Sequence, residues 1–264
     1  MKNKTTYLAL NLFLITSIAF SQKMIKASTI MKDIKAGKNV TIKNAKIVGV
    51  LDFTFMDEAI EKLPKRKKNS WFNWNNNGNG NTNEVKKLIE NKISFTNCTF
   101  IDDVLAYIPD EDSGYTFTAS FEDTAIFKNC IFDRKAMFKY SRFERNTDFS
   151  DSSFNDDSTF KYAKFNKDIS FANTTFDEVA TFKYAKFNNN VSFSNAVFKD
   201  SAIFKYTNFS DGVSFKNTNF EEDLNIKYMK VSGNFNVSNM KVAYDIDSKY
   251  TKINGKSFSK YLID

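Results

Sequence analysis

Lysine and tyrosine recur together in this chain, and this pairing is the feature that most suggests binding chemistry. A Lys-Tyr pair follows a large apolar residue once every 22 residues. A row of ammonium groups attracts anions, and phenol rings beside them suit contact with sugars or apolar groups. The pattern predicts a binding face for an anionic partner, such as an acidic polysaccharide, a lipid head group or an acidic protein surface. Its residues are Lys139, Tyr140, Lys161, Tyr162, Lys183, Tyr184, Lys205, Tyr206, Lys227 and Tyr228.

The same residues also have a purely structural interpretation. Like charges stacked about 4.8 Å apart in a sheet repel by ~1 kcal/mol per pair in water. The ammonium groups would then splay into solvent, while stacked tyrosines cover the sheet. Repeats copy their surface residues whether or not a partner uses them. The sequence leaves both interpretations open.

Asparagine recurs with the same 22-residue period, and we interpret this column as structural because stacked amides hydrogen-bond along a ladder. Its residues are Asn129, Asn173, Asn195, Asn217 and Asn239, with Asp151 in the same series. Another position is rich in Asp and Glu, which fits a solvated edge or weak cation binding. No segment has the ligand spacing of an EF-hand loop. We expect no metal site and no cofactor.

Cys98 and Cys130 are the two cysteines, and each stands two residues before a Phe. Their separation of 32 residues equals one 22-residue period plus a 10-residue insertion. This spacing places them directly above one another, at a strand separation compatible with a disulfide. We predict adjacent thiols in the core, either bridged or as two small buried residues without a bond.

Catalytic residues are not predicted, and we expect the protein not to be an enzyme. The chain has 29 Phe and no His, which excludes imidazole bases, His triads and His metal ligands. Paired carboxylates repeat along the acidic position without one pair being distinguished. The less favoured enzyme hypothesis rests on residues 54–92, where Trp71, Trp74 and a basic run from Lys65 to Lys68 could shape a cleft.

A strict repeat must position these side chains. Large apolar residues follow one another at alternating intervals of six and five from Phe121 to Val242, and most are Phe. A small or β-branched residue usually stands two places earlier, and residues two apart on extended chain share a face. Each unit therefore points one large and one small side chain inward. Four such sides in 22 residues close a square coil.

This pattern resembles the pentapeptide-repeat family, whose motif is a central Leu or Phe with a small residue two places earlier, as in Ala180-Thr181-Phe182 and Ala185-Lys186-Phe187. The resemblance implies an all-β fold, a right-handed quadrilateral β-helix. Six-residue sides, few Leu, and Lys, Thr or Ser where the family prefers Asp or Asn are departures from it. A parallel β-helix with longer, irregular coils is the alternative fold.

The chain divides into four parts on this interpretation. Residues 1–21 are a signal peptide, with a basic start, an apolar run and cleavage near Ser21. Residues 22–39 form an N-terminal cap with a short helix that Ser28 caps and Gly37 ends. Residues 40–242 form the β-helix, with excursions at 54–92 and 101–116, and residues 243–264 form a C-terminal cap. The mature chain should be exported to the periplasm or beyond, with no transmembrane span.

These features predict an exported, non-enzymatic scaffold whose partner the sequence does not identify. Binding of anionic glycans or the cell surface through the Tyr and Lys columns is the alternative. Some pentapeptide-repeat proteins imitate DNA and act on type II topoisomerases, but that resemblance transfers poorly. A DNA mimic needs an acidic surface and a cytoplasmic location, whereas this chain has a formal charge of +7 and a signal peptide. The charge is too small to indicate nucleic acid binding.

Overall fold

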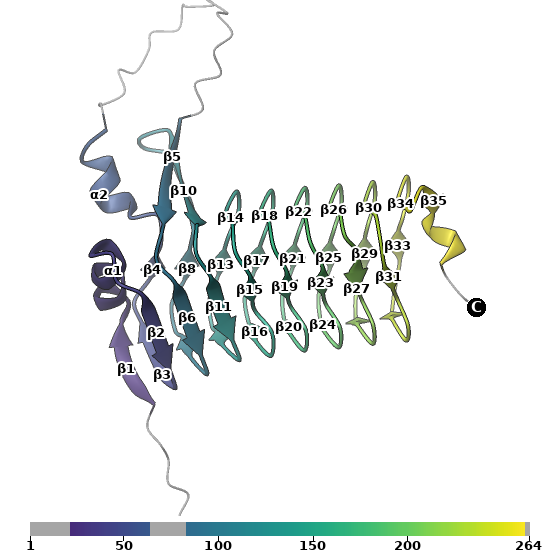
Figure 1. Ribbon diagram of the computed structural model, residues 1–264, viewed down its shortest axis with the longest axis horizontal. Coiled ribbons are helices and arrows are strands. Elements are labelled where there is room, and N and C mark those ends of the chain that lie inside the picture. The colour runs from purple at the N-terminus through teal and green to yellow at the C-terminus, as the bar shows by residue number, and fades with distance from the viewer. Residues whose placement is uncertain (1–21, 64–82, 262–264) are drawn as a thin grey trace, which may run out of the picture.

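The structure, a computed structural model, describes residues 22–63 and 83–261 as a four-sided rod of short, mostly parallel strands (Figure 1). Each turn of the chain contributes one strand to each of four sheets, here called A, B, C and D. The order within a coil is B, A, C, D, and the eight strands of sheet B mark eight coils. The prediction of a four-sided β-helix is confirmed.

The strands of the four sheets have the following bounds. Sheet A contains β1 (Lys23–Lys26), β3 (Ala45–Val48), β7 (Thr99–Phe100), β12 (Ile131–Phe132), β16 (Ser153–Phe154), β20 (Thr175–Phe176), β24 (Val197–Phe198), β28 (Asn219–Phe220) and β32 (Lys241–Val242). Sheet B contains β2 (Val40–Lys43), β6 (Ile93–Thr96), β11 (Ala125–Lys128), β15 (Thr147–Asp148), β19 (Ile169–Ser170), β23 (Val191–Ser192), β27 (Val213–Ser214) and β31 (Phe235–Asn236). Sheet C contains β4 (Leu51–Asp52), β8 (Val104–Leu105), β13 (Ala136–Met137), β17 (Ser158–Thr159), β21 (Ala180–Thr181), β25 (Ala202–Ile203), β29 (Leu224–Asn225) and β33 (Ile246–Asp247). Sheet D contains β5 (Glu84–Ile89), β10 (Tyr115–Phe121), β14 (Arg142–Phe143), β18 (Lys164–Phe165), β22 (Lys186–Phe187), β26 (Asn208–Phe209), β30 (Lys230–Val231), β34 (Lys252–Ile253) and β35 (Lys256–Ser257), with β9 (Tyr107–Asp110) paired to β10.

Stacked phenylalanine rings form the core of the rod. In sheet D, Phe143 pairs with Phe165 and Phe165 pairs with Phe187, so the register advances by 22 residues per coil. Their ring centroids lie 4.8 Å apart, and all three rings are fully buried. Rings from different sides meet edge to face, as Phe182 does with Phe193 at 5.2 Å. Burial of each such ring is worth about 1.5–3 kcal/mol, which makes this column the main source of cohesion.

Two kinds of corner explain the alternation of five- and six-residue intervals. A five-residue interval contains a tight turn, in which the Ala163 N–H donates to the Phe160 carbonyl at 2.9 Å and Tyr162 adopts a positive φ of 59°. A six-residue interval turns through a wider bend with one additional residue, as from Phe165 to Phe171. Tight turns lie between sheets B and A and between sheets C and D. The two corner types therefore alternate around the coil.

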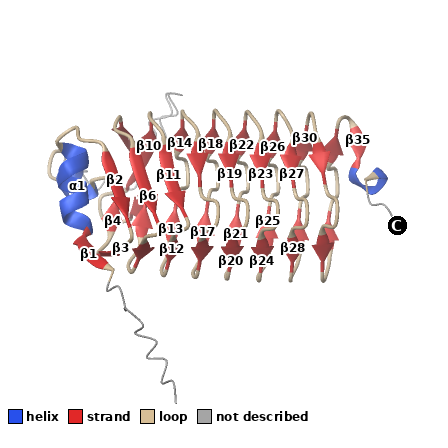
Figure 2. Ribbon diagram, turned by 60° about the horizontal axis from the view of Figure 1, so that its bottom comes forward, coloured by secondary structure: helices blue, strands red, loops and turns tan. Residues whose placement is uncertain are grey.

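The N-terminal end is covered by the helix α1 (Ala27–Lys35), which lies across the first coil (Figure 2). Ala27, Ile30 and Ile34 are buried against the core, as expected of a cap. The prediction that Ser28 begins the helix is wrong. Lys26 is the N-cap and makes no side-chain cap bond, because β1 runs directly into the helix from its pairing with β3.

Both excursions are shorter than predicted, and both leave the rod between sheets C and D. The first contains α2 (Met56–Ile60) and ends before β5, whose Ile89 packs in the core. The second is the β9–β10 hairpin. Residues 101–106 stay in the rod, because β8 pairs with β13. The sequence pattern does not indicate this sheet C strand because Ala106 stands where later coils have Phe. In Figure 1, α2 and the hairpin rise above the N-terminal end of the rod.

The coils extend beyond Val242, where the sequence predicted a cap. β33 pairs with β29 and β34 with β30 in unbroken register. The continuation was hidden because Ser248 occupies the position that Phe holds in earlier coils. The end is covered by β35 and a 3-10 helix (Phe258–Lys260), where Phe258 and Tyr261 meet the ring of Phe235 edge-on at 6.2 and 5.5 Å.

Candidate binding ridge

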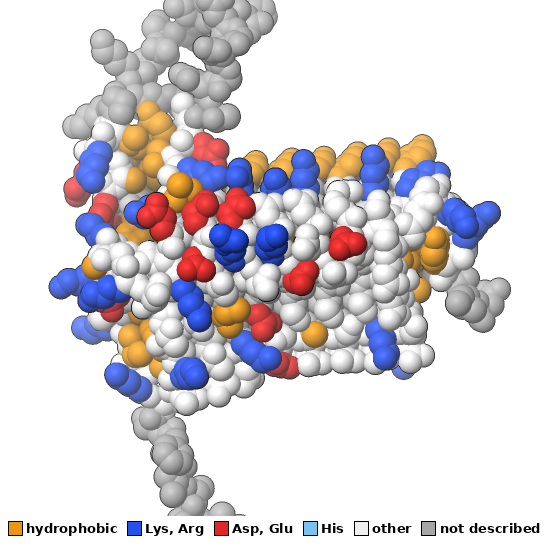
Figure 3. Space-filling view, viewed as in Figure 1, with side chains coloured by type: hydrophobic (Ala, Val, Ile, Leu, Met, Phe, Trp, Pro, Cys, Tyr) orange, Lys and Arg blue, Asp and Glu red, His pale blue; other side chains and the backbone are white. Residues whose placement is uncertain are grey.

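The predicted Lys and Tyr columns form a ridge along the corner between sheets C and D. We call it the Tyr/Lys ridge. It contains the ten predicted residues together with Lys249 and Tyr250, which the sequence analysis missed. Figure 3 shows hydrophobic side chains, a class that includes Tyr in its colouring, along the upper edge of the rod, with Lys and Arg next to them. That edge is where the turns into β14, β18 and β22 lie in Figure 1.

The tyrosines of the ridge occupy a strained backbone position. All six have φ between 59° and 62°, the left-handed region at the third position of a tight turn. Such turns favour Gly or Asn there, and a bulky L-residue costs about 1–2 kcal/mol. The turns are held regardless of side chain by coil-to-coil bonds, such as the Tyr162 N–H donating to the Lys183 carbonyl at 3.0 Å. Tyrosine at this position is therefore maintained against a backbone preference.

The opposite tight corner, between sheets B and A, meets the same demand with asparagine. The column has φ between 51° and 61°, a range that Asn tolerates. Asn195 donates its amide to Asn173, Asn217 donates to Asn195, and Asn239 donates to Asn217, at 2.9, 2.9 and 3.0 Å. The column begins earlier than predicted, since Asn97 donates to Asn44 and Asn129 to Asn97. These amides satisfy one another and have a structural role.

The ring faces of the ridge are covered by each other. Centroids of successive tyrosines from Tyr140 to Tyr250 lie 4.6–5.0 Å apart, with interplanar angles of 1–21°. At the N-terminal end, Tyr107 lies 5.9 Å from Tyr140 in a tilted contact. The rings therefore present edges and hydroxyl groups outward, not faces. This arrangement does not suit the stacking of sugars on the ring faces, which the tyrosine column had led us to expect.

The ridge lysines lie beside the rings of their own coils. Each Nζ from Lys139 to Lys249 is 5.0–6.0 Å from the centroid of the following tyrosine, a cation–π distance. Burial, and then the charges of Lys139 and Lys183, lower the pKa of Lys161. Burial and the adjacent phenols raise the pKa of Tyr206. The ridge is thus a row of closely spaced positive charges whose mutual repulsion the rings offset in part.

Opposite charges flank sheet C. The bend between sheets A and C is acidic in the later coils, and we call it the acidic edge. It contains Asp156, Asp157, Asp177, Glu178, Asp200, Glu221, Glu222, Asp223 and Asp245. A shallow groove of about 540 Å³ runs over sheet C between them, bordered by Lys139, Lys161 and Lys183 on one side and by Lys135, Asp157 and Val179 on the other. In the coil of β13 both borders are basic, whereas from the coil of β17 onward this face is bipolar across its width.

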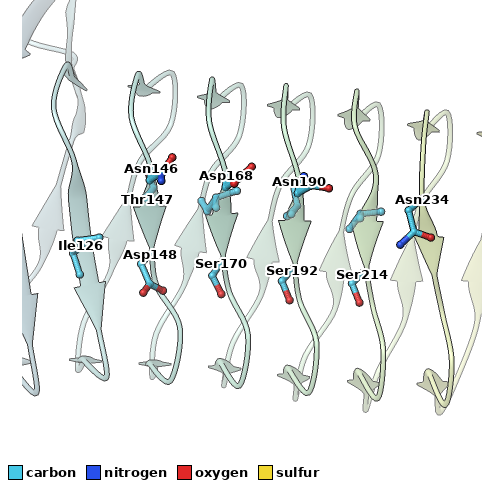
Figure 4. A pocket seen from close by; sticks show the side chains of 13 residues that line it. Ile126, Asn146, Thr147, Asp148, Asp168, Ser170, Asn190, Ser192, Ser214 and Asn234 are labelled. Carbon is cyan, nitrogen blue, oxygen red and sulfur yellow. The ribbon is translucent and has the colours of Figure 1, made fainter.

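A second groove, of about 550 Å³, lies over sheet B (Figure 4). Its floor is a column of short polar side chains, Asp148, Ser170, Ser192 and Ser214, which follow one another from coil to coil. Ser194 lies within hydrogen-bond distance of Ser192 and Ser214, at 3.2 and 2.8 Å. No imidazole is present in the chain, and within the described residues no hydrogen bond joins these serines to Asp148 or Asp168, the two carboxylates that line the groove. This groove has no nucleophile and base in a catalytic arrangement.

The two cysteines are stacked in adjacent coils, and their thiols are free and buried. Thr99 pairs with Ile131, the residue after Cys130, which places Cys98 beneath it as the spacing predicted. The adjacent Cys130 thiol lowers the pKa of Cys98. The same contact, together with burial, raises the pKa of Cys130. The two sulfurs are not bonded to each other in the structure.

The remaining candidates are a metal site and the residues of the enzyme hypothesis. In residues 22–63 and 83–261, no group of three His, Cys, Asp or Glu side chains is placed to hold a metal ion. The basic run, Trp71 and Trp74 of the enzyme hypothesis lie outside the described residues, as does the predicted signal peptide. No helix in the described part of the chain is both long and apolar enough to cross a membrane.

Comparison with known proteins identifies the repeat. Residues 138–186 and 182–229 match a family model described as pentapeptide repeats (9 copies). The matched region contains ridge residues from Lys139 to Tyr228 and most of the acidic edge. Neither a curated protein nor a solved structure matches the chain.

Proposed function

This chain belongs to the pentapeptide-repeat family and is a repeat scaffold, and from that premise we propose that it is an exported, non-enzymatic binding protein that holds an anionic partner along the Tyr/Lys ridge. The observation that carries the proposal is the strained tyrosine column. Strain of about 1–3 kcal/mol per residue persists where the surrounding structure enforces it, and it clusters at functional positions. Asn at the opposite corner shows that the fold has an unstrained solution available.

The charge of the ridge supports an anionic partner. Within the described residues, Lys161, Lys183 and Lys205 form no ion pair, so their charges face solvent or a partner. Sheet D adds Arg142, Lys164, Lys186, Lys230 and Lys252 beside them. A row of one sign raises the local concentration of oppositely charged groups and speeds association with them. The phenol hydroxyl groups add hydrogen-bond donors at the coil spacing.

The non-catalytic part of the proposal is supported by how the rod is filled. Its interior is a continuous column of buried Phe rings, so convergent polar groups have no internal pocket. The grooves over sheets B and C are open and repeat from coil to coil, so neither singles out one reactive residue. Repetition of this kind suits recognition of an extended partner better than chemistry at one atom.

Export is supported by the sequence of residues 1–21, which combines a basic start, an apolar run and small residues before Gln22. The partner class that this location would offer is an anionic surface outside the cytoplasm, of a polysaccharide, a lipid or a protein. Its recognition would use the ammonium and hydroxyl groups of the ridge, because the ring faces are covered.

The experiment compares two charge reversals at equivalent backbone positions. Lys161→Glu with Lys183→Glu reverses the ridge. Lys128→Glu with Lys216→Glu reverses two exposed lysines that precede the left-handed residue at the Asn corner. Binding to heparin and to phosphatidylglycerol vesicles is measured against salt. We expect the ridge variant to lose at least about tenfold in affinity, and the control to keep most of it.

Three outcomes would contradict the proposal. The first is an equal loss of affinity in both variants. The second is that the unmodified protein binds neither heparin nor the vesicles, and the third is binding that does not weaken as the salt concentration is raised. Circular dichroism spectra of both variants should match that of the unmodified protein, since the substituted side chains are on the surface.

A further inference from the structure

Sheet C is the one side of the rod that lies between the Tyr/Lys ridge and the acidic edge. Within one coil, Lys183 lines one border of the groove and Val179 the other, with Glu178 next to Val179 and Thr181 on the sheet between them. In the coil before, Asp156 is the register equivalent of Glu178, and Asp157, Thr159 and Lys161 line the groove. Both borders repeat at the coil spacing of about 4.8 Å because both follow the register of the strands.

A second copy of this chain carries charges at the same spacing, which few other partners would match over several coils. Two copies can pack face to face through sheet C in two symmetric ways. A two-fold axis parallel to the rod places the acidic edge of each copy against the ridge of the other. A two-fold axis across the rod places acid against acid and lysine against lysine. Only the first arrangement is electrostatically complementary, and it satisfies both borders at once.

We infer that sheet C is a self-association face through which two copies form a parallel, two-fold symmetric dimer. The inference rests on the proposed function, because it uses the same ridge and identifies its anionic partner as the acidic edge of a second copy. The symmetry opposes each coil to the same coil of the other copy, so Lys183 of one faces Glu178 of the other. The two contacts are equivalent and occur on both borders.

The floor of the face suits this packing. Within the groove, its outward column is Met137, Thr159, Thr181 and Ile203, all half-buried and uncharged. The column continues through Asn225 to Asp247, which lies beyond the groove and pairs with Lys227 in its own chain. Because each residue meets its own counterpart, neutral side chains oppose neutral side chains along the length of the groove. The charged borders rise above this floor as the walls of the groove, so they make contact first.

The carboxylates needed for the contact are available. Asp157 and Glu178 are exposed, and within the described residues their side chains form no ion pair or hydrogen bond. Asp177, by comparison, pairs with Lys199 in its own chain at 2.8 Å. A single narrow sheet face is at the low end of interface sizes, so we expect a weak, reversible dimer. Its charged borders should make it dissociate as salt is raised.

The test is a charge swap between copies, followed by sedimentation velocity over a range of protein and salt concentrations. One variant carries Lys161→Glu and Lys183→Glu, and the other carries Asp157→Lys and Glu178→Lys. In each homodimer both borders become repulsive. In a mixed dimer, the reversed ridge of the first variant faces the reversed acidic edge of the second. On the other border, the original acidic edge of the first variant faces the original ridge of the second, so both borders are attractive. We expect each variant alone to be monomeric and the mixture to dimerise within about tenfold of the unmodified affinity.

Each other outcome overturns the inference in a recognisable way. A monomeric unmodified protein at low salt rejects the dimer. A dimer that persists in both variants places the interface elsewhere, and a mixture that stays monomeric rejects the parallel arrangement. Heparin binding measured on the same variants separates this inference from the proposed function. If the unmodified protein is monomeric but the Lys161→Glu, Lys183→Glu variant loses heparin binding, the ridge binds anions and the partner is not a second copy.

Discussion

Replacing Tyr184, in the middle of the ridge, separates the backbone strain of this corner from the stacking of its rings. The ring of Tyr184 stacks on two neighbours at 4.7 Å each, and its own lysine lies 5.3 Å from the centroid. Two aromatic contacts at ~0.5–1.5 kcal/mol each and an exposed cation–π contact of ~0.5 kcal/mol amount to about 1.5–3.5 kcal/mol. Any substitution that removes the ring loses this stabilisation.

Tyr184→Gly and Tyr184→Ala lose the same ring but differ in strain. Glycine adopts the φ of 62° freely, whereas alanine retains a left-handed cost of ~1–2 kcal/mol. The greater chain entropy of unfolded glycine offsets ~0.5–1 kcal/mol of that difference. The Gly variant should therefore be more stable than the Ala variant by ~0.5–1 kcal/mol. This order is the reverse of the one expected in an ordinary strand.

Urea unfolding followed by circular dichroism measures the difference, with equal slopes required for the two variants. Thr181→Gly and Thr181→Ala are the matched control, because Thr181 is on the adjacent strand β21 and has no positive φ. There the Ala variant should be the more stable. If Tyr184→Ala proves as stable as Tyr184→Gly, the ridge is not strained, and the argument that tyrosine is maintained there for a partner fails.

Four other substitutions or measurements test the rest of the structure. Phe182→Ala removes a fully buried ring from the core and should cost about 3–5 kcal/mol in unfolding free energy, whereas Phe182→Leu should cost much less. Asn195→Ala loses two ladder hydrogen bonds and places alanine at a φ of 59°, so it should cost about 2–3 kcal/mol, and Asn195→Gly should cost less. Lys161→Gln should raise the melting temperature at pH 7, because the lowered pKa of Lys161 means that the fold disfavours its charged form; the gain should vanish as pH rises toward the ordinary pKa of 10.5. Alkylation of the native protein, followed by peptide mass spectrometry, should be slow at both buried thiols and should modify Cys98 before Cys130, since contact between the two thiols lowers the pKa of Cys98 and raises that of Cys130.

Several features of the fold and site were readable from the sequence because a solenoid is nearly one-dimensional. Each residue contacts mainly those one coil away, so the 22-residue period directly predicts the stacking of Phe143 on Phe165, the Asn ladder, the cysteine pair and the Tyr/Lys columns. The prediction failed where a coil lacked its marker residue. Ala106 and Ser248 replace Phe, and the side of the coil at each position was assigned to an excursion or a cap.

The positive φ of the ridge tyrosines has a signal in the sequence. Tyr162 stands two residues after Phe160 in a five-residue interval, the same place that Asn173 occupies after Phe171. Asn is a common left-handed residue, so the equivalence would have predicted positive φ for the tyrosines. Tyrosine alone carries no such indication, which is why the column was interpreted only through its rings and charges.

By itself, the sequence determined the four-sided coil, its period and which side chains face inward, since these depend only on the spacing of large and small residues along the chain. Only the tertiary structure decided that the tyrosine faces cover one another, that both excursions leave from the same corner, and that the ridge and the acidic edge border a single sheet. Those properties depend on how the backbone turns at each corner and on which corners share a side. The spacing of large and small residues along the chain would be identical for different corner geometries, so the sequence pattern does not distinguish between them.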